Sequence, residues 1–282
     1  MLLLVIWQEH SIMSIILNEQ KLTIPNIKTV SWLDPEAQAL GLKEVSHKSK
    51  RNTWLRGIVC HTIHGKLGKL LPGLGPDTSI DIANARYQVN TTKQVSWDYT
   101  CDLNGDWLIQ NDPTKFYTWQ ATSVNGYTCG FELVQQDNGD LYEGQIAKAV
   151  EFIDFLTVKL GIQRQIPWDM KNNCPYKKTV NRIAGSNNAK DVVGVYSHYM
   201  QTTSRGYGDP GPYIQQALKD AGYETYAFDG DDDKTVWKAR QRAIGIPAGD
   251  CDGIPGPATV RALKASGNAH GMFVSRPIDA LI

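Results

Sequence analysis

Hydrophobic positions follow two spacings along this chain. Alternating or short continuous apolar runs between turn residues predict β-strands, and apolar positions three or four residues apart predict helices. The predicted strands cover residues 28–33, 56–62, 95–101, 106–110, 127–135 and 191–197, and the predicted helices cover 77–90, 145–160 and a stretch near 212–222. Because helices interleave with strands, we expect an α/β fold with a mixed central β-sheet flanked by helices.

Two polar stretches bear on domain organisation. Residues 164–190 contain Pro167, Pro175 and paired asparagines, which predict a long ordered surface loop. The segment "FDGDDD" at 228–233 is short, polar and turn-forming, and a separate helical pattern follows it. We therefore expect an N-terminal extension and first strand over 1–50, a main domain over 51–227, and a small all-α C-terminal module over 228–282.

The amino end begins with an apolar run that ends early. "MLLLVIW" has no basic residue before it and meets Gln8, Glu9 and His10 almost at once, so it is too short to span a bilayer. Residues 1–12 are either an upstream start before Met13, a disordered extension, or a short buried strand. We expect no export signal and no stable membrane association.

Composition narrows the class of protein. The 282 residues are 41% hydrophobic and 21% charged, typical of a soluble globular chain. Lys plus Arg number 29 and Asp plus Glu also number 29, so no net field favours nucleic acid as a partner. The five cysteines are scattered without a CxxC pair, which argues against a cysteine-framed zinc module and a disulfide scaffold.

Three polar side chains stand at the ends of apolar strands or in a tight turn. His61 ends the strand in "RGIVCHTIHG", His198 ends the strand in "DVVGVYSHYM", and Asp209 lies in the turn "GDPGP". Two imidazoles and one carboxylate make a zinc site with a fourth position open for water. Taken alone, a histidine of this kind is more often a structural residue, and an aspartate before Pro-Gly is more often a turn residue or helix cap.

A fourth candidate lies on another predicted strand. In "NGYTCGFELVQ" strand alternation places Glu132 on one face with Thr128 and Gly130. A carboxylate on a mostly apolar strand is desolvated, and the resulting rise in its pKa suits a general base. The alternative is a glutamate on the solvent side of an antiparallel strand.

The order of these fragments resembles the zinc-dependent N-acetylmuramoyl-L-alanine amidases of the peptidoglycan-recognition-protein superfamily. The resemblance covers roughly residues 51–225. After His61 come "VSWDYTCDLNGDW" (95–107), "YTWQAT" (117–122), "NGYTCGFELV" (125–134), "VYSHYM" (195–200) and "GDPGPYI" (208–214), in the family's order. This resemblance implies that His61, His198 and Asp209 bind Zn²⁺, that Glu132 is the catalytic base, and that Trp119 binds substrate.

The chain departs from the family pattern at several positions. The threonine that often stands two places after the first zinc histidine is displaced to Thr62, which leaves His64 as a competing ligand. Gln120 replaces the histidine of the family's "W-H" segment. Tyr207 stands where the family has a lysine or comparable polar group, with Arg205 two residues earlier, so either side chain is a candidate to stabilise the oxyanion. We expect Tyr207 to be catalytic and Arg205 to bind substrate.

The C-terminal tail carries a second resemblance. Residues 234–267 are similar to the helical peptidoglycan-binding repeat, with Asp252, Gly253, Gly256, Pro257, Thr259, Ala262 and Leu263 matching its signature. Pro255 occupies the usual aromatic position. The alternative is a structural turn followed by an amphipathic helix.

Together the two resemblances imply a monomeric bacteriophage endolysin. Its partner would be bacterial peptidoglycan, and it would cleave the amide bond between N-acetylmuramic acid and L-alanine. It would reside in the host cytoplasm before lysis and reach the cell wall after release by a separate pore-forming protein. Two other functions stay open: a non-catalytic peptidoglycan-recognition protein, and a zinc endopeptidase that cuts within the stem peptide.

Overall fold

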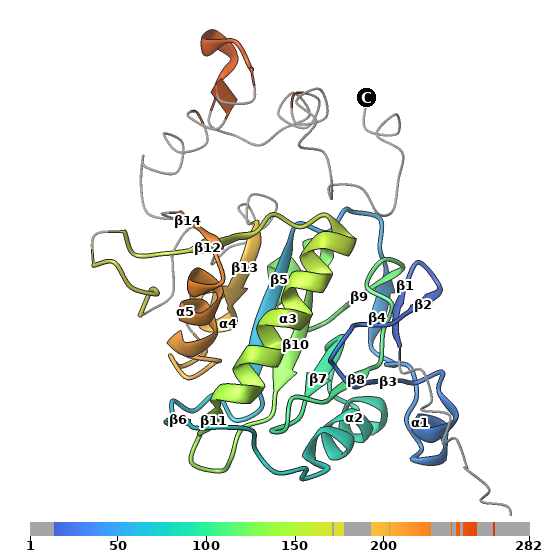
Figure 1. Cartoon of the computed structure of the whole chain (residues 1–282). Helices are drawn as coiled ribbons and strands as arrows, with labels where there is room; N and C mark the ends of the chain where they lie inside the picture. The colour runs from blue at the N-terminus through green and yellow to red at the C-terminus, as the bar shows by residue number, and fades with distance from the viewer. Residues whose placement is uncertain are drawn as a thin grey trace, which may run out of the picture.

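Six strands form the central sheet of this chain, in the order β13-β5-β10-β7-β8-β3 (Figure 1). The structure is a computed structural model, and it describes residues 14–170, 172–177, 193–202, 204–226, 238, 241–242, 245–252 and 262. The strands of the sheet are β3 (Thr29–Ser31), β5 (Gly57–Thr62), β7 (Tyr99–Cys101), β8 (Trp107–Ile109), β10 (Thr128–Leu133) and β13 (Gly194–Ser197). Each lies inside one of the six strands predicted from apolar patterning.

The sheet is mixed, as expected. β5 pairs in parallel with both β10 and β13, and β10 pairs in parallel with β7. β8 is antiparallel to β7 and parallel to β3. The interior position of β10 contradicts the alternative that Glu132 lies on the solvent side of an antiparallel strand.

Helices cover both faces of the sheet. α3 (Glu143–Leu160) and α5 (Pro212–Asp220) pack together on one face, where their apolar side chains join the main core. α1 (Pro35–Ala39) and α2 (Ile80–Asn90) pack near the β8 and β3 edge, around Ala37, Ala85 and Leu108. The predicted α/β architecture with flanking helices is therefore confirmed. In the described part of the chain, no helix is both long and apolar enough to cross a membrane.

The remaining elements are short. They are β1 (Ile15–Leu17), β2 (Gln20–Leu22), β4 (Lys48–Lys50), β6 (Leu70–Leu71), β9 (Phe116–Thr118), η1 (Thr122–Tyr127), β11 (Leu141–Tyr142), β12 (Gln165–Pro167), α4 (His198–Gln201), β14 (Glu224–Tyr226) and η3 (Ala248–Asp250). β1 pairs with β2, β4 with β9, β6 with β11, and β12 with β14.

The interpretation of residues 164–190 as surface loop is wrong at its start. β12 pairs in parallel with β14, and Ile166 and Trp168 are buried in the main core. The partner strand lies far along the chain, so local composition carried no sign of it. Residues 171 and 178–190 of this stretch, the extension 1–12 and most of the C-terminal module lie outside the described residues.

Candidate metal centre

Strand alternation on β5 separates core residues from site residues. All six residues of β5 are buried. Ile58 and Cys60 enter the main core with α3, whereas Val59 belongs to a second apolar cluster on the opposite face. His61 is two residues after Val59 and therefore shares that opposite face. The strand is thus anchored on both sides before it delivers His61 at its carboxyl end.

Glu132 lies beside His61 because of the register between two strands. β10 pairs with β5 so that Glu132 is opposite His61 and Gly130 is opposite Val59. Directly paired residues of adjacent parallel strands project to the same face. Cys129, Phe131 and Leu133 point the other way, into the main core. The imidazole and the carboxylate consequently share one face of the sheet.

His198 comes from the next strand on the other side of β5. β13 pairs in parallel with β5, with Ser197 opposite Cys60, and His198 is the following residue and the first of α4. Its imidazole packs on that of His61, with ring centroids 4.2 Å apart. Two adjacent parallel strands therefore bring the two imidazoles together at their carboxyl ends.

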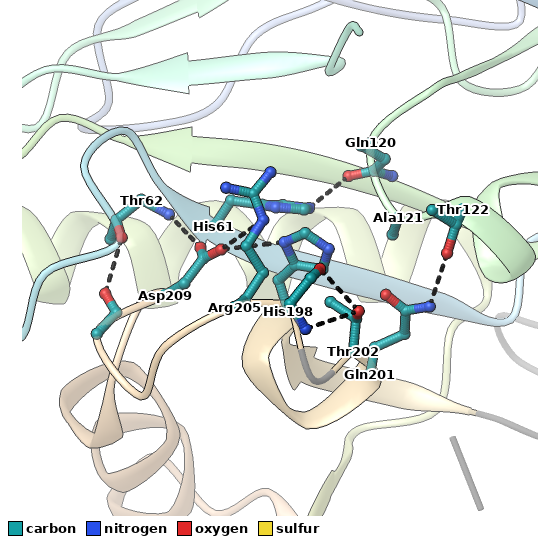
Figure 2. Close-up of polar contacts among 12 residues, drawn as sticks. His61, Thr62, Gln120, Ala121, Thr122, His198, Gln201, Thr202, Arg205 and Asp209 are labelled. Carbon is teal, nitrogen blue, oxygen red and sulfur yellow. Dashed lines mark hydrogen bonds and ion pairs between the residues drawn. The ribbon is translucent and has the colours of Figure 1, made fainter. Parts of the chain in front are cut away.

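Asp209 is fixed by hydrogen bonds to both histidine-bearing segments (Figure 2). The backbone N–H of Thr62 donates to Oδ1 of Asp209 at 2.8 Å, and Oδ2 lies 3.0 Å from Nδ1 of His198. The Thr62 hydroxyl also donates to the carbonyl oxygen of Gly208 at 2.8 Å. Gly208 itself needs to be glycine, because a Cβ there would stand 2.0 Å from the carbonyl carbon of Lys66. Thr62 therefore holds the Asp209 turn against β5.

The three side chains form a compact cluster of potential metal ligands. His61, His198 and Asp209 are all buried, and each offers a ligand atom within 4.8 Å of those of the other two. Two imidazoles and one carboxylate suit zinc with a further position open. The competing candidate His64 is not part of this cluster, since its Nε2 lies 3.7 Å from Asp137 on a partly exposed side chain. We refer to His61, His198 and Asp209 as the triad.

Burial sets the charge states within the triad. Burial, and then the neighbouring His198, lower the pKa of His61 to about 3, so its imidazole is neutral and able to donate a lone pair at neutral pH. Burial by itself raises the pKa of Asp209. The hydrogen bond with His198, the nearby imidazoles and the N–H of Thr62 outweigh that effect and lower it overall. Both side chains are thus in the form that binds a cation.

Glu132 has the opposite electrostatic character. Burial, followed by repulsion from the Asp209 carboxylate, raises the pKa of Glu132 well above its usual value, against the attraction of Arg205. Its Oε2 atom is buried and has no hydrogen-bond partner among the described residues. An ordinary structural carboxylate is satisfied when buried. An unsatisfied carboxylate next to a metal-ligand cluster has the environment of a proton-transfer group.

A cleft of about 770 Å³ opens beside the triad. Its lining includes His198, Trp119, Gln120 and Arg205, together with hydroxyl and amide groups of η1 and of the segment before β5. The Nε atom of Arg205 lies 3.8 Å from Oδ2 of Asp209, although half of the side chain is exposed. The predicted substrate-binding residues Trp119 and Arg205 therefore line the same cleft as His198 of the triad.

Tyr207 lies apart from this lining. Its ring packs edge-on against Tyr199, with centroids 5.0 Å apart, and it belongs to the periphery of the second apolar cluster. Burial raises the pKa of Tyr207, followed by the influence of Cys174. Between the two oxyanion candidates, only Arg205 lines the cleft.

Two contacts at the centre were not predicted from the sequence. One is the support of Asp209 by Thr62, and the other is Gln120, whose Oε1 lies 3.0 Å from Nε2 of His61. The sequence marked both residues only as departures from a family pattern. At each of these two positions, the departure from the family pattern was the one signal available in the sequence. The loops that bring these atoms together have no periodic pattern.

Comparisons with known proteins give weak similarities. No protein-family model matches the chain, and no curated protein matches it. Among solved structures, Drosophila peptidoglycan recognition protein SD superposes with a TM-score of 0.43 at 12% identity, covering 72% of this chain and 99% of that one. The Staphylococcus aureus hydrolase AmiA, solved with its ligand, gives 0.36 at 13%, covering 70% and 82%. At scores this low, neither similarity establishes a shared fold or activity.

Proposed function

We propose that this chain is a zinc-dependent peptidoglycan hydrolase that cleaves the amide bond between N-acetylmuramic acid and L-alanine. One observation carries the proposal: three potential zinc ligands from distant parts of the chain converge beside the carboxylate of Glu132, whose Oε2 atom is buried and has no hydrogen-bond partner among the described residues. The cleft beside them supplies space for an extended substrate. The sequence resemblance to zinc amidases indicates which bond of the substrate is cleaved.

The triad fits the metal by the chemistry of its donors. His61, His198 and Asp209 would hold zinc through two imidazole nitrogens and one carboxylate oxygen. When bound, zinc supplies a Lewis acid for the substrate carbonyl and lowers the pKa of a water molecule. The hydrogen bonds from Thr62 and His198 orient Asp209 for this role before any metal is present.

Glu132 is the proton-transfer group of the proposed reaction. Its partnerless Oε2 accepts a proton from the attacking water and returns it to the leaving amine of L-alanine. In this step a C–O bond forms and the C–N bond of the amide breaks. Burial and the Asp209 charge make Glu132 more basic than an exposed glutamate, which supports the assignment.

Arg205 is the better-supported donor to the developing oxyanion. It lines the cleft, and its guanidinium reaches the edge of the triad, whereas Tyr207 packs against Tyr199 outside the cleft lining. A cationic donor stabilises negative charge more strongly than a neutral hydroxyl. Trp119 is assigned to substrate binding, since its indole forms part of the cleft wall and is fixed by a hydrogen bond from Nε1 to Oγ of Ser49.

The decisive experiment is digestion of purified bacterial sacculi by the full chain. We expect release of glycan strands with free N-acetylmuramic acid ends, together with intact stem peptides identified by mass. A chelator should stop release, and added zinc should restore it. Masses that correspond to cuts within the stem would establish the endopeptidase instead. Binding to sacculi without any release in the presence of zinc would establish the non-catalytic receptor.

The biological setting is a further part of the proposal and has only the sequence resemblances behind it. We propose a monomeric phage endolysin that acts from the host cytoplasm after a separate protein permeabilises the membrane. Expression in a bacterium should then leave cells intact until the membrane is opened, and lysis should follow at once. Secretion of active protein from intact cells would contradict this placement.

A further inference from the structure

The His61 imidazole contacts one neutral side chain outside the triad. Its Nε2 atom lies 3.0 Å from Oε1 of Gln120, and the contact is buried (Figure 2). An amide oxygen only accepts hydrogen bonds, so Nε2 must carry the hydrogen. A neutral imidazole with hydrogen on Nε2 has its lone pair on Nδ1. The contact with Gln120 therefore selects which nitrogen of His61 is free to bind a cation.

The position of the Gln120 amide is fixed from two sides. The backbone N–H groups of Gln120 and Ala121 donate to Oδ1 of Asn125 at 3.2 and 2.6 Å, which anchors the segment at the start of η1. The side-chain amide lies over Gly130 of β10, where a Cβ would come within 1.4 Å of Oε1. Only glycine at position 130 leaves room for it. The backbone of this segment is thus anchored by Asn125, and the Gln120 amide packs over Gly130; Nε2 of the amide has no hydrogen-bond partner among the described residues.

We infer that Gln120 is a positioning residue that holds His61 in the tautomer with hydrogen on Nε2, so that Nδ1 is the atom His61 contributes to the metal site. The inference rests on the metal-binding part of the proposed function and not on amide cleavage. Outer hydrogen-bond partners of this kind orient ligating histidines and raise metal affinity. A neutral amide does so without adding a third carboxylate to a site that already contains Asp209 and Glu132.

Zinc affinity of the full chain tests this role with a matched pair of variants. Gln120→Leu keeps the approximate volume and removes the acceptor, and we expect about 10–100-fold weaker zinc binding in competition with a chromophoric chelator. Gln94 lines the same cleft with an exposed side chain, so Gln94→Leu should bind zinc like wild type. A Gln120→Leu protein with a native circular dichroism spectrum and wild-type zinc affinity would overturn the inference.

A second variant and a spectroscopic measurement separate tautomer control from general packing. Gln120→Glu retains an acceptor and should restore zinc affinity to the wild-type value or above; equal weakening in both variants would contradict the role of the acceptor. Long-range ¹H–¹⁵N correlation spectra of zinc-free wild type should show His61 protonated on Nε2, with the signal assigned by its loss in His61→Gln. Protonation on Nδ1 would overturn the inference even if Gln120→Leu does not fold. If wild type does not bind zinc, the proposed function is wrong. The tautomer of His61 is still tested in that case, because the spectrum is recorded without zinc.

Discussion

On β10, neighbouring side chains belong to two different environments. Phe131 and Leu133 pack into the apolar core under α3, while Glu132 between them lies beside His61 on the opposite face. We call these the core face and the site face of the sheet. The same strands, with the same backbone hydrogen bonds, support both.

The two faces differ in the kind of group that they bury. On the core face, the rings of Trp107 and Phe152 stack at 3.8 Å, and Tyr99 meets Phe152 edge-on at 5.1 Å. On the site face, Oε2 of Glu132 and Nε2 of Gln120 are buried without a partner in the described part of the chain. Buried unsatisfied groups cost stability. On the core face, the Tyr99 hydroxyl and Nε1 of Trp107 are also buried without a partner in the described residues. The faces therefore differ in that the site face buries part of an ionisable carboxylate, which costs more than burying a hydroxyl or an indole N–H.

The largest effect that separates the faces is expected at Glu132. Glu132→Gln removes the proton acceptor and should lower turnover of sacculi by about 10²–10⁴-fold. Zinc content should stay at the wild-type value, because the triad is intact. In the zinc-free protein at neutral pH, the free energy of unfolding should be unchanged or higher, since a carboxylate whose pKa is raised by burial has been removed. Substantial remaining turnover would exclude Glu132 from the mechanism.

The core face should show the reverse pattern. Phe152→Ala removes the ring that packs against Trp107 and Tyr99, and should lower the free energy of unfolding by about 3–5 kcal/mol in denaturant titrations. The folded fraction should bind zinc normally. Val158 lies on the same helix with 62% of its surface exposed, so Val158→Ala should change stability by less than about 0.5 kcal/mol. Weaker zinc binding in folded Phe152→Ala would show that the two faces are coupled.

A raised carboxyl pKa does not by itself mark a functional group, and Asp81 provides the test. Burial, followed by repulsion from Asp102, raises the pKa of Asp81 on α2 from 3.8 to about 7. The folded protein therefore retains a proton that the unfolded chain releases between these values, and this contribution to stability is lost as pH rises from about 4 to about 7.

Replacing this carboxyl should remove that pH dependence. Asp81→Asn should match wild-type stability at pH 4 and exceed it by on the order of 4 kcal/mol at pH 8, with turnover unchanged. Chemical denaturation at the two pH values measures the difference. An equal change at both pH values would assign the effect to packing, and a loss of turnover would extend the site to α2.

The predictability of this fold from its sequence depended on the length of each pattern. The six strands of the central sheet coincide with predicted apolar runs because alternation is a local property that survives in any tertiary context. β12 was missed, since a three-residue strand ending in Pro167 gains its stability from β14, far along the chain. The pairing of β12 and the burial of Trp168 both depend on tertiary contacts.

The candidate site was predictable only in outline. Strand ends and motif order brought His61, His198 and Asp209 into one hypothesis, and the structure places them together. The register that sets Glu132 opposite His61 is specified by packing on both faces of β10 and not by either strand alone. The contacts of Thr62 and Gln120 depend on the paths of two irregular loops, which no periodic pattern encodes.

The smallest expected effect compares a satisfied hydroxyl with an unsatisfied one. Thr118, on β9, is fully buried, and its Oγ1 donates to Oδ2 of Asp98 at 3.1 Å, whereas Oγ1 of the equally buried Thr29 has no partner in the described part of the chain. Thr118→Val should therefore cost about 1–2 kcal/mol of stability, and Thr29→Val should be neutral or slightly stabilising, as measured by denaturant midpoints. Asp98 also accepts from the N–H of Gly130, so its carboxylate is held by several donors, unlike that of Glu132. If both variants lose equal stability, the missing hydrogen-bond partner of Thr29 does not lower the cost of removing its hydroxyl.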